Sequence, residues 1–237
     1  MVFTKKAKTI TCCAVGVVLG VSAYAATRFL PRAERAAPGM RHLVCIGDSI
    51  TFGAGVAWAR ELRAWPYRLN KLLGKDWQVL NLGVSGATAQ DEADFSYREH
   101  GFLKAAAKAK PELTLLMLGT NDSKPYNWDA VRYERDILRL VEELRALSGH
   151  LVLLLPPKAF PGKDGFVGYD IRDEIIHDEL LPILRSTAQK LSLPAIDLYT
   201  FTQAHPEYFD DGVHPNGKGN RVIAEFVAQS LRSLQLI

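Results

Sequence analysis

Ser49 is a candidate nucleophile, because only Asp48 separates it from an apolar run of strand length. The stretch Cys45–Gly53 is CIGDSITFG, so a buried strand leads directly into Gly-Asp-Ser. A serine at such a point can equally cap a helix or stabilise a turn. As a nucleophile it needs a base, an acid that orients the base, and donors for a developing oxyanion. The rest of the sequence must supply those partners.

Two of these partners are present in the segment FDDGVHPNGKG. Asp211 and His214 lie three residues apart in a loop rich in glycine and proline. One short turn can place this carboxylate beside the imidazole, where it would fix the tautomer and stabilise the imidazolium formed in catalysis. His205 is the rival histidine nearby. No His, Cys or Asp pattern has the spacing of metal ligands, so we expect no metal.

Two further segments offer donors for an oxyanion. Asn121 in GTND carries a side-chain amide that can donate, and Gly86 in NLGVSGAT can bring its backbone N–H close to a ligand. Taken alone, Asn121 could fix its own turn and Gly86 could occupy a tight turn. Taken together, four segments supply a nucleophile, a base, an acid and two donors.

Apolar runs that alternate with amphipathic segments predict the elements that hold these residues. We expect strands over 41–47, 77–83, 112–119, 150–157 and 194–201. We expect helices over 64–74, 102–110, 128–149, 173–193 and 216–234, with a kink or break at Pro182. Strands that are apolar on both faces and alternate with helices predict a parallel sheet covered on both sides. Ligands bind beyond the carboxyl ends of such strands, where the four segments fall.

The four segments also resemble a known family. GDSITFG, NLGVSGAT, GTND and DGVHPN resemble the four sequence blocks of the SGNH (GDSL-type) hydrolases, in the family's order. The resemblance extends from about residue 43 to residue 228. It implies an α/β fold, a flavodoxin-like three-layer α/β/α sandwich with a five-stranded parallel sheet, and ester hydrolysis through an acyl-enzyme without a cofactor.

The resemblance also implies a role for each matched residue. Ser49 would be the nucleophile, His214 the general base, and Asp211 the residue that orients His214. The N–H groups of Ser49 and Gly86 and the amide of Asn121 would form the oxyanion hole. Asp48 matches the motif as well, and we expect it to be structural.

The segment GTNDSKPYNW bears on the substrate. It resembles a form found in bacterial SGNH carbohydrate esterases, including sialate O-acetylesterase-like proteins, so Lys124 and Trp128 are candidate substrate-binding residues. Trp128 could instead begin the long helix and pack against the sheet. The Gly/Pro-rich loop 156–170 is a candidate lid or substrate loop, with Phe160, Phe166 and Tyr169 available for contact.

We therefore expect a serine esterase that removes short acyl groups, principally acetyl, from a carbohydrate. One alternative is a lysophospholipase or arylesterase acting on longer acyl chains. Another is a glycan-binding protein of the same fold without catalysis, and an acyltransferase that uses the same residues also stays open. The sequence does not indicate an oligomeric state.

The first 25 residues have the composition of a targeting segment. Three lysines precede an apolar run that ends in Ala23-Tyr24-Ala25, which is typical of a cleaved signal peptide. An uncleaved membrane anchor or a buried helix are the alternatives. Residues 26–40 would be a linker and 41–237 the hydrolase domain, so we expect export to the periplasm or the exterior, or a membrane tether. The formal charge of +3 comes from those three lysines, so the neutral remainder gives no argument for nucleic-acid binding.

Overall fold

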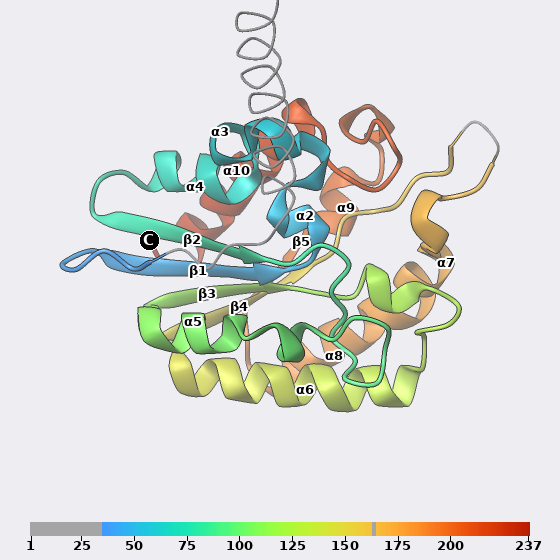
Figure 1. Cartoon of the computed structure of the whole chain (residues 1–237), viewed down its shortest axis with the longest axis horizontal. Coiled ribbons are helices and arrows are strands. Elements are labelled where there is room, and N and C mark those ends of the chain that lie inside the picture. Colours follow the sequence, from blue (N-terminus) through green and yellow to red (C-terminus); the bar gives the residue numbers. More distant parts are fainter. Residues whose placement is uncertain (1–34, 163–164) are drawn as a thin grey trace, which may run out of the picture.

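The computed structural model describes residues 35–162 and 165–237 and contains a five-stranded, fully parallel sheet (Figure 1). The strand order is β2-β1-β3-β4-β5, which is the flavodoxin-like order. The strands are β1 Arg41–Gly47, β2 Trp77–Gly83, β3 Leu113–Met117, β4 His150–Leu155 and β5 Ala195–Asp197. The predicted fold class is therefore confirmed.

Helices cover both faces of the sheet. In Figure 1, α2, α3, α4 and α10 lie above the sheet, and α5, α6 and α8 lie below it. The helices are α2 Ser49–Phe52, α3 Arg60–Arg63, α4 Trp65–Leu73, α5 Phe102–Ala109, α6 Ala130–Leu147, α7 Asp173–Ile175, α8 Leu181–Lys190, α9 Leu198–Thr202 and α10 Gly217–Ser233. Within the described residues, no helix is both long enough and apolar enough to span a membrane.

The sheet separates two hydrophobic cores because successive strand residues point to opposite faces. In β1, Val44 and Ile46 join the core between the sheet and the helices α5, α6 and α8. Leu43 and Cys45 join the core shared with α4 and α10, where Trp65 is fully buried. This two-sided burial explains why the strands are continuous apolar runs. Because all five strands are parallel, their carboxyl ends lie at one edge of the sheet, where the candidate site is built.

Two predicted elements differ from the observed ones: the fifth strand ends early, and the helix predicted over 173–193 is interrupted. The fifth strand stops at Asp197, because the Asp197 side chain accepts a hydrogen bond from the Thr200 N–H (2.9 Å) and caps α9. The predicted helix 173–193 is interrupted by a π-helical turn at Ile176–Leu180. Pro182 follows this turn as the second residue of α8, and the π-helical turn interrupts the regular hydrogen-bond ladder just before the proline, which has no N–H to donate.

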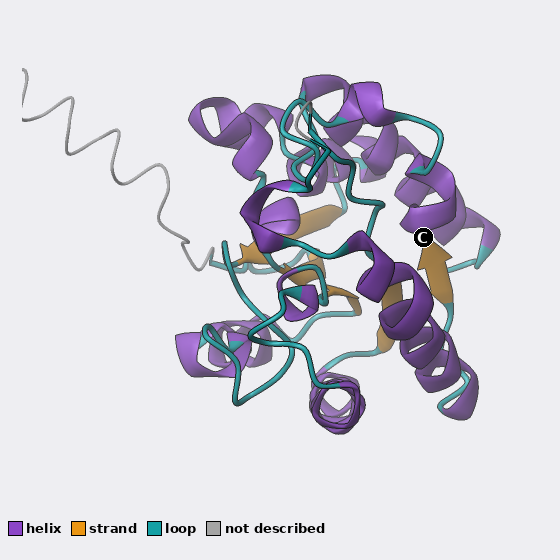
Figure 2. Cartoon of the chain, turned by 90° about the vertical axis from the view of Figure 1, so that its right-hand side faces the viewer, coloured by secondary structure: helices purple, strands orange, loops and turns teal. Residues whose placement is uncertain are grey.

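Gly83, at the end of β2, allows α2 to lie directly on the sheet. A Cβ atom at this position would be 2.2 Å from the backbone nitrogen of Phe52, so any other side chain would push α2 away. This close approach determines where α2, and Ser49 at its first position, meet the carboxyl edge of the sheet. Figure 2 looks onto this edge and shows loops gathered over the strand ends.

Candidate active site

Ser49 is the first residue of α2 and follows β1 after one intervening residue, Asp48. The side chain of Asp48 accepts a hydrogen bond from the N–H of Ile50 (2.8 Å) and caps the helix. The N–H of Ser49 lies in the first helical turn, where no intrahelical acceptor is available. The sharp passage from strand to helix therefore presents both the hydroxyl and the N–H of Ser49 at the edge of the sheet.

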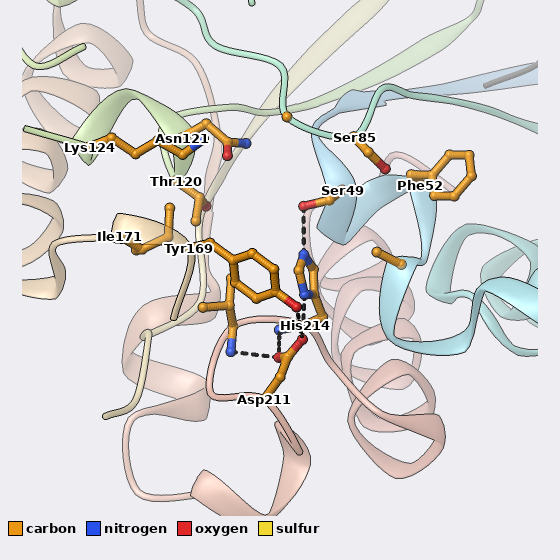
Figure 3. Close-up of a pocket in the computed structure, with 13 residues that line it drawn as sticks. Ser49, Phe52, Ser85, Thr120, Asn121, Lys124, Tyr169, Ile171, Asp211 and His214 are labelled. Carbon is orange, nitrogen blue, oxygen red and sulfur yellow. Dashed lines mark hydrogen bonds and ion pairs between the residues drawn. The ribbon is translucent and has the colours of Figure 1, made fainter. Parts of the chain in front are cut away.

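His214 and Asp211 lie in the loop before α10, and Figure 3 shows them beneath Ser49. His214 Nε2 is 2.9 Å from Ser49 Oγ, and His214 Nδ1 is 2.7 Å from Asp211 Oδ2. The loop is fixed at its end by Asn216, whose side chain caps α10 by accepting from two backbone N–H groups. The result is a continuous hydrogen-bonded chain from serine to histidine to aspartate.

The ionisation state of Asp211 determines which atoms donate and which accept along this hydrogen-bonded chain. Partial burial opposes its ionisation, but the hydrogen bonds from the ring and backbone N–H of His214 and from the Val213 N–H outweigh it. Together they hold the pKa of Asp211 well below its usual range. An ionised carboxylate can only accept, so His214 Nδ1 carries the proton and Nε2 is left to accept from Ser49. This tautomer is the one a general base requires.

A pocket of about 430 Å³ opens beside Ser49, within the usual size range of small-molecule sites. Its walls come from loops that follow β1, β2, β3 and β4 and from the loop before α10. The lining residues are Ser49, Phe52, Ala54, Ser85, Gly86, Thr120, Asn121, Lys124, Tyr169, Ile171, Asp211, Val213 and His214. Among the described residues, no group of three or more His, Cys, Asp or Glu side chains is placed to hold a metal ion.

Gly86 and Asn121 both lie in the wall of this pocket. Gly86 has a φ of +87°, a left-handed conformation that favours glycine. The Asn121 amide donates to the carbonyl of Ala87 (3.2 Å), and in Figure 3 it points toward the side of the pocket where Ser49 lies. The structure therefore brings the two predicted donors together at the serine.

Asp122 holds the loop of Gly86 against the loop of Asn121. Its buried carboxylate accepts the backbone N–H groups of Ala89 (3.0 Å) and Gln90 (2.9 Å). Burial raises its pKa to about 6, although these two donors oppose the shift. The carboxylate thus crosslinks the segments that follow β2 and β3, which fixes the spacing between the two donor residues.

Of the two candidate substrate-binding residues, the structure brings only Lys124 to the pocket. Trp128 packs on Tyr133, with 5.4 Å between ring centroids, and its Nε1 donates to Glu179 (2.9 Å). It belongs to the edge of the hydrophobic core beneath the sheet. The expectation that Trp128 contacts substrate is therefore not met, because Asp129 caps α6 and the preceding indole packs back onto that helix.

Of the three aromatic residues named from the sequence in loop 156–170, Tyr169 is the one in the pocket wall. Its hydroxyl donates to Asp211 Oδ2 (3.0 Å), and its ring meets the His214 ring edge-on at 4.9 Å and 75°. Of the other two aromatic residues named in loop 156–170, Phe160 is buried beside Phe209 and Phe166 is 72% exposed. Tyr169 reaches the pocket through a left-handed backbone, φ +63°, which a non-glycine sequence does not signal.

Asp48 is fully buried, and its Oδ2 has no hydrogen-bond partner within the described residues. Burial is the largest influence on this carboxyl and raises its pKa to about 6, against the opposing effect of the Ile50 N–H. The expectation that Asp48 is structural agrees with its position as the cap of α2. Its charge is a cost to the folded state at neutral pH.

We expect Asp48→Asn to raise the free energy of unfolding at pH 8 by about 1–3 kcal/mol, because asparagine can keep the cap without a charge. With a folded-state pKa near 6, the wild-type folded state binds more protons than the unfolded state between about pH 4 and 6. Wild-type stability therefore falls as the pH rises through that window. Urea unfolding of both proteins at about pH 4 and pH 8 measures this. An equal gain at both pH values would contradict the assigned charge cost.

Comparison with known proteins identifies the family. Residues 45–222 match the sequence profile of the GDSL-like Lipase/Acylhydrolase family. An acetylxylan esterase of Xylanibacter ruminicola is 32% identical over 211 residues, which cover 80% of this chain and 43% of that protein. This chain therefore spans less than half the length of that relative.

Two further comparisons are more distant. The thioesterase 1/protease 1/lysophospholipase L1 of Escherichia coli K12 is 24% identical over 200 residues, covering 81% of this chain and 84% of that protein. The crystal structure of a carbohydrate acetylesterase family member from Sinorhizobium meliloti superposes with a TM-score of 0.66 at 24% identity. The superposition covers 84% of this chain and 100% of that chain. The TM-score and this coverage together establish that the two proteins share a fold. The profile match extends over most of the sequence and includes all four segments, so this chain belongs to the GDSL-like lipase/acylhydrolase family.

Proposed function

We propose that this protein is a serine esterase in which Ser49 is the nucleophile, His214 the general base and Asp211 the residue that orients His214. The observation that carries the proposal is the continuous hydrogen-bonded chain from Ser49 Oγ through His214 to Asp211, at the wall of a ligand-sized pocket. A glycan-binding protein without catalysis has no need for such a chain, which makes that alternative less favourable.

The reaction follows from the polarity of the chain. His214 Nε2 takes the proton of Ser49 as Oγ attacks the ester carbonyl, and Asp211 stabilises the imidazolium. The N–H groups of Ser49 and Gly86 and the amide of Asn121 are the proposed donors to the oxyanion. His214 then protonates the leaving alcohol, and afterwards it activates the water that releases the acid from the acyl-enzyme. The proposed cycle needs no metal or organic cofactor.

For the substrate, we propose acetyl esters of a carbohydrate. The acetylxylan esterase to which this chain is similar supports an acetyl group and a sugar alcohol. The size of the pocket supports a short acyl group, because about 430 Å³ must hold the acyl group and part of the alcohol together. Lys124, whose ammonium is 3.9 Å from the carboxylate of Asp94, offers a polar contact at the same wall.

A longer acyl chain is the second candidate, favoured by the similarity to a lysophospholipase. We expect the full chain to hydrolyse p-nitrophenyl acetate with a kcat/KM about tenfold or more above that for the octanoate. Each additional methylene gains about 0.8 kcal/mol only where the pocket buries it. A preference for octanoate would move the proposal to lipid esters, and Ser49→Ala protein supplies the blank for both substrates.

We also propose that the protein is exported, either as a secreted or periplasmic enzyme or tethered through its N-terminus. Support comes from the lysines and the apolar run of residues 1–25, which lie outside the described residues. The mass of the mature protein distinguishes the two forms, because cleavage after Ala25 removes the apolar run and a tether retains it.

A further inference from the structure

Tyr169 is an exposed side chain that is nevertheless held in one orientation. It is 57% exposed, yet its hydroxyl is hydrogen-bonded to Asp211 and its ring packs on the His214 ring in a T-shaped arrangement. Tyr169 and the next residue, Asp170, both have left-handed backbones, with φ values of +63° and +58°. Two successive non-glycine residues in this region are unfavourable, and such strain is concentrated at functional sites.

The loop that carries Tyr169 is anchored before and after this residue. After it, the N–H of Arg172 donates to the hydroxyl of Ser123 (3.2 Å). Before it, the N–H of Ala159 donates to the carboxylate of Asp173 (2.9 Å), which also pairs with Lys158. The N–H of Phe160 donates to the carbonyl of Gly212 (2.8 Å), which joins this loop to the one that carries Asp211. The loop that carries Tyr169 is therefore joined to the loop that carries Asp211, and the ring itself is oriented by its contacts with Asp211 and His214.

In the proposed reaction, the leaving alcohol and the oxyanion lie on different sides of the pocket. His214 must deliver its proton to the leaving oxygen, so the leaving alcohol lies on the His214 side. The oxyanion lies toward Gly86 and Asn121. Tyr169 contacts His214, and Figure 3 shows its ring beside the His214 ring with its hydroxyl directed toward Asp211. The exposed part of the ring consequently borders the space that the leaving alcohol occupies.

We propose that Tyr169 determines specificity for the leaving group, by offering its aromatic face to a ring-shaped alcohol such as a pyranose or a phenol. This rests on the proposed function of Ser49 and His214. Ring C–H groups pack well against an aromatic face. A ring already fixed by Asp211 and His214 loses little conformational freedom when a ligand binds, which favours its use as a binding surface.

The test keeps the acyl group constant and changes the alcohol. The kcat/KM values of the full chain are measured for ethyl acetate, phenyl acetate and a monoacetylated methyl xyloside. We expect Tyr169→Ala to reduce the preference for one or both ring esters over ethyl acetate by about tenfold, and Tyr169→Phe to retain it within about threefold. A loss confined to the phenyl ester assigns an aryl alcohol, and a loss confined to the xyloside assigns a sugar. Phe166→Ala is the matched control, because this exposed ring of the same loop is not in the pocket wall.

Three results would overturn the inference. An unchanged preference in Tyr169→Ala removes the role of the ring. An equal loss of preference in Tyr169→Phe assigns the effect to the hydroxyl. A uniform loss for all three esters in both variants makes Tyr169 a positioning residue for Asp211. If instead the wild-type chain shows no turnover that depends on Ser49, the proposed function itself fails. Competitive inhibition by methyl xyloside, expected to weaken in Tyr169→Ala for a sugar-binding ring, gives a readout that needs no catalysis by the variant.

Discussion

Ser49→Ala should lower kcat for p-nitrophenyl acetate by about 10⁴-fold or more, to a rate close to that of the buffer. The substitution removes the oxygen that forms the acyl-enzyme, and no other hydroxyl lies at hydrogen-bond distance from His214 Nε2 among the described residues. Initial rates of purified wild-type and variant protein at matched concentration measure the loss.

The fold of the Ser49→Ala variant should be retained, because one small side chain at the edge of the pocket is exchanged for another. Thermal unfolding of both proteins checks this. Ser186→Ala, in α8 and outside the pocket wall, is a control for purification and should retain full activity. Turnover by Ser49→Ala above about one hundredth of the wild-type rate would remove Ser49 from the proposed role.

Asp211→Asn should lower kcat by about 10⁴-fold while changing the fold little, because the effect lies in the tautomer of His214. Asp211 Oδ1 accepts two backbone N–H groups, from Val213 (3.0 Å) and His214 (2.7 Å). Asparagine can keep both with its oxygen and would then turn its NH₂ toward His214 Nδ1. The asparagine NH₂ can donate to Nδ1 only when Nδ1 carries no proton, so the ring proton lies on Nε2. Nε2 then cannot accept the proton of Ser49.

The neighbouring aspartate provides a matched control for this variant. Asp210 accepts from the side chain of Asn216 (2.7 Å) and does not line the pocket, so Asp210→Asn should stay within about twofold of wild type. Measuring kcat of both variants by steady-state kinetics compares the same Asp-to-Asn change at two adjacent positions. Similar losses in both would indicate damage to the loop, and a loss of less than about tenfold in Asp211→Asn would contradict the assigned role.

Much of the fold followed from the sequence, because parallel strands buried on both faces leave an unambiguous apolar signal. The five strands and the helical segments between them were predicted near their observed bounds. The exception is the fifth strand, which was predicted to run through Phe201 but stops at Asp197. There the side chain of Asp197 caps α9 and ends the strand, although the apolar residues continue beyond it.

The candidate site was predictable for a related reason. Ser49, Gly86 and Asn121 each follow a parallel strand, so the topology alone gathers them at one edge, and His214 joins them from the loop before α10. Side chains whose positions depend on tertiary packing were not predictable. Trp128 turns into the core, and Tyr169 reaches Asp211 through a backbone conformation that its residue type disfavours.

The division of the pocket among separate loops has a consequence for how its preference for substrates can change. The Ser49–His214–Asp211 chain uses only the start of α2 and the loop before α10. Much of the remaining wall, including Lys124 and Tyr169, belongs to the loops that follow β3 and β4. The proposed nucleophile, base and orienting acid are thus encoded apart from the loop that follows β4, whereas the loop that follows β3 carries both Lys124 and the proposed oxyanion donor Asn121. Recombination or loop grafting at the end of β4 is therefore expected to alter which ester is accepted while the proposed reacting atoms keep their places.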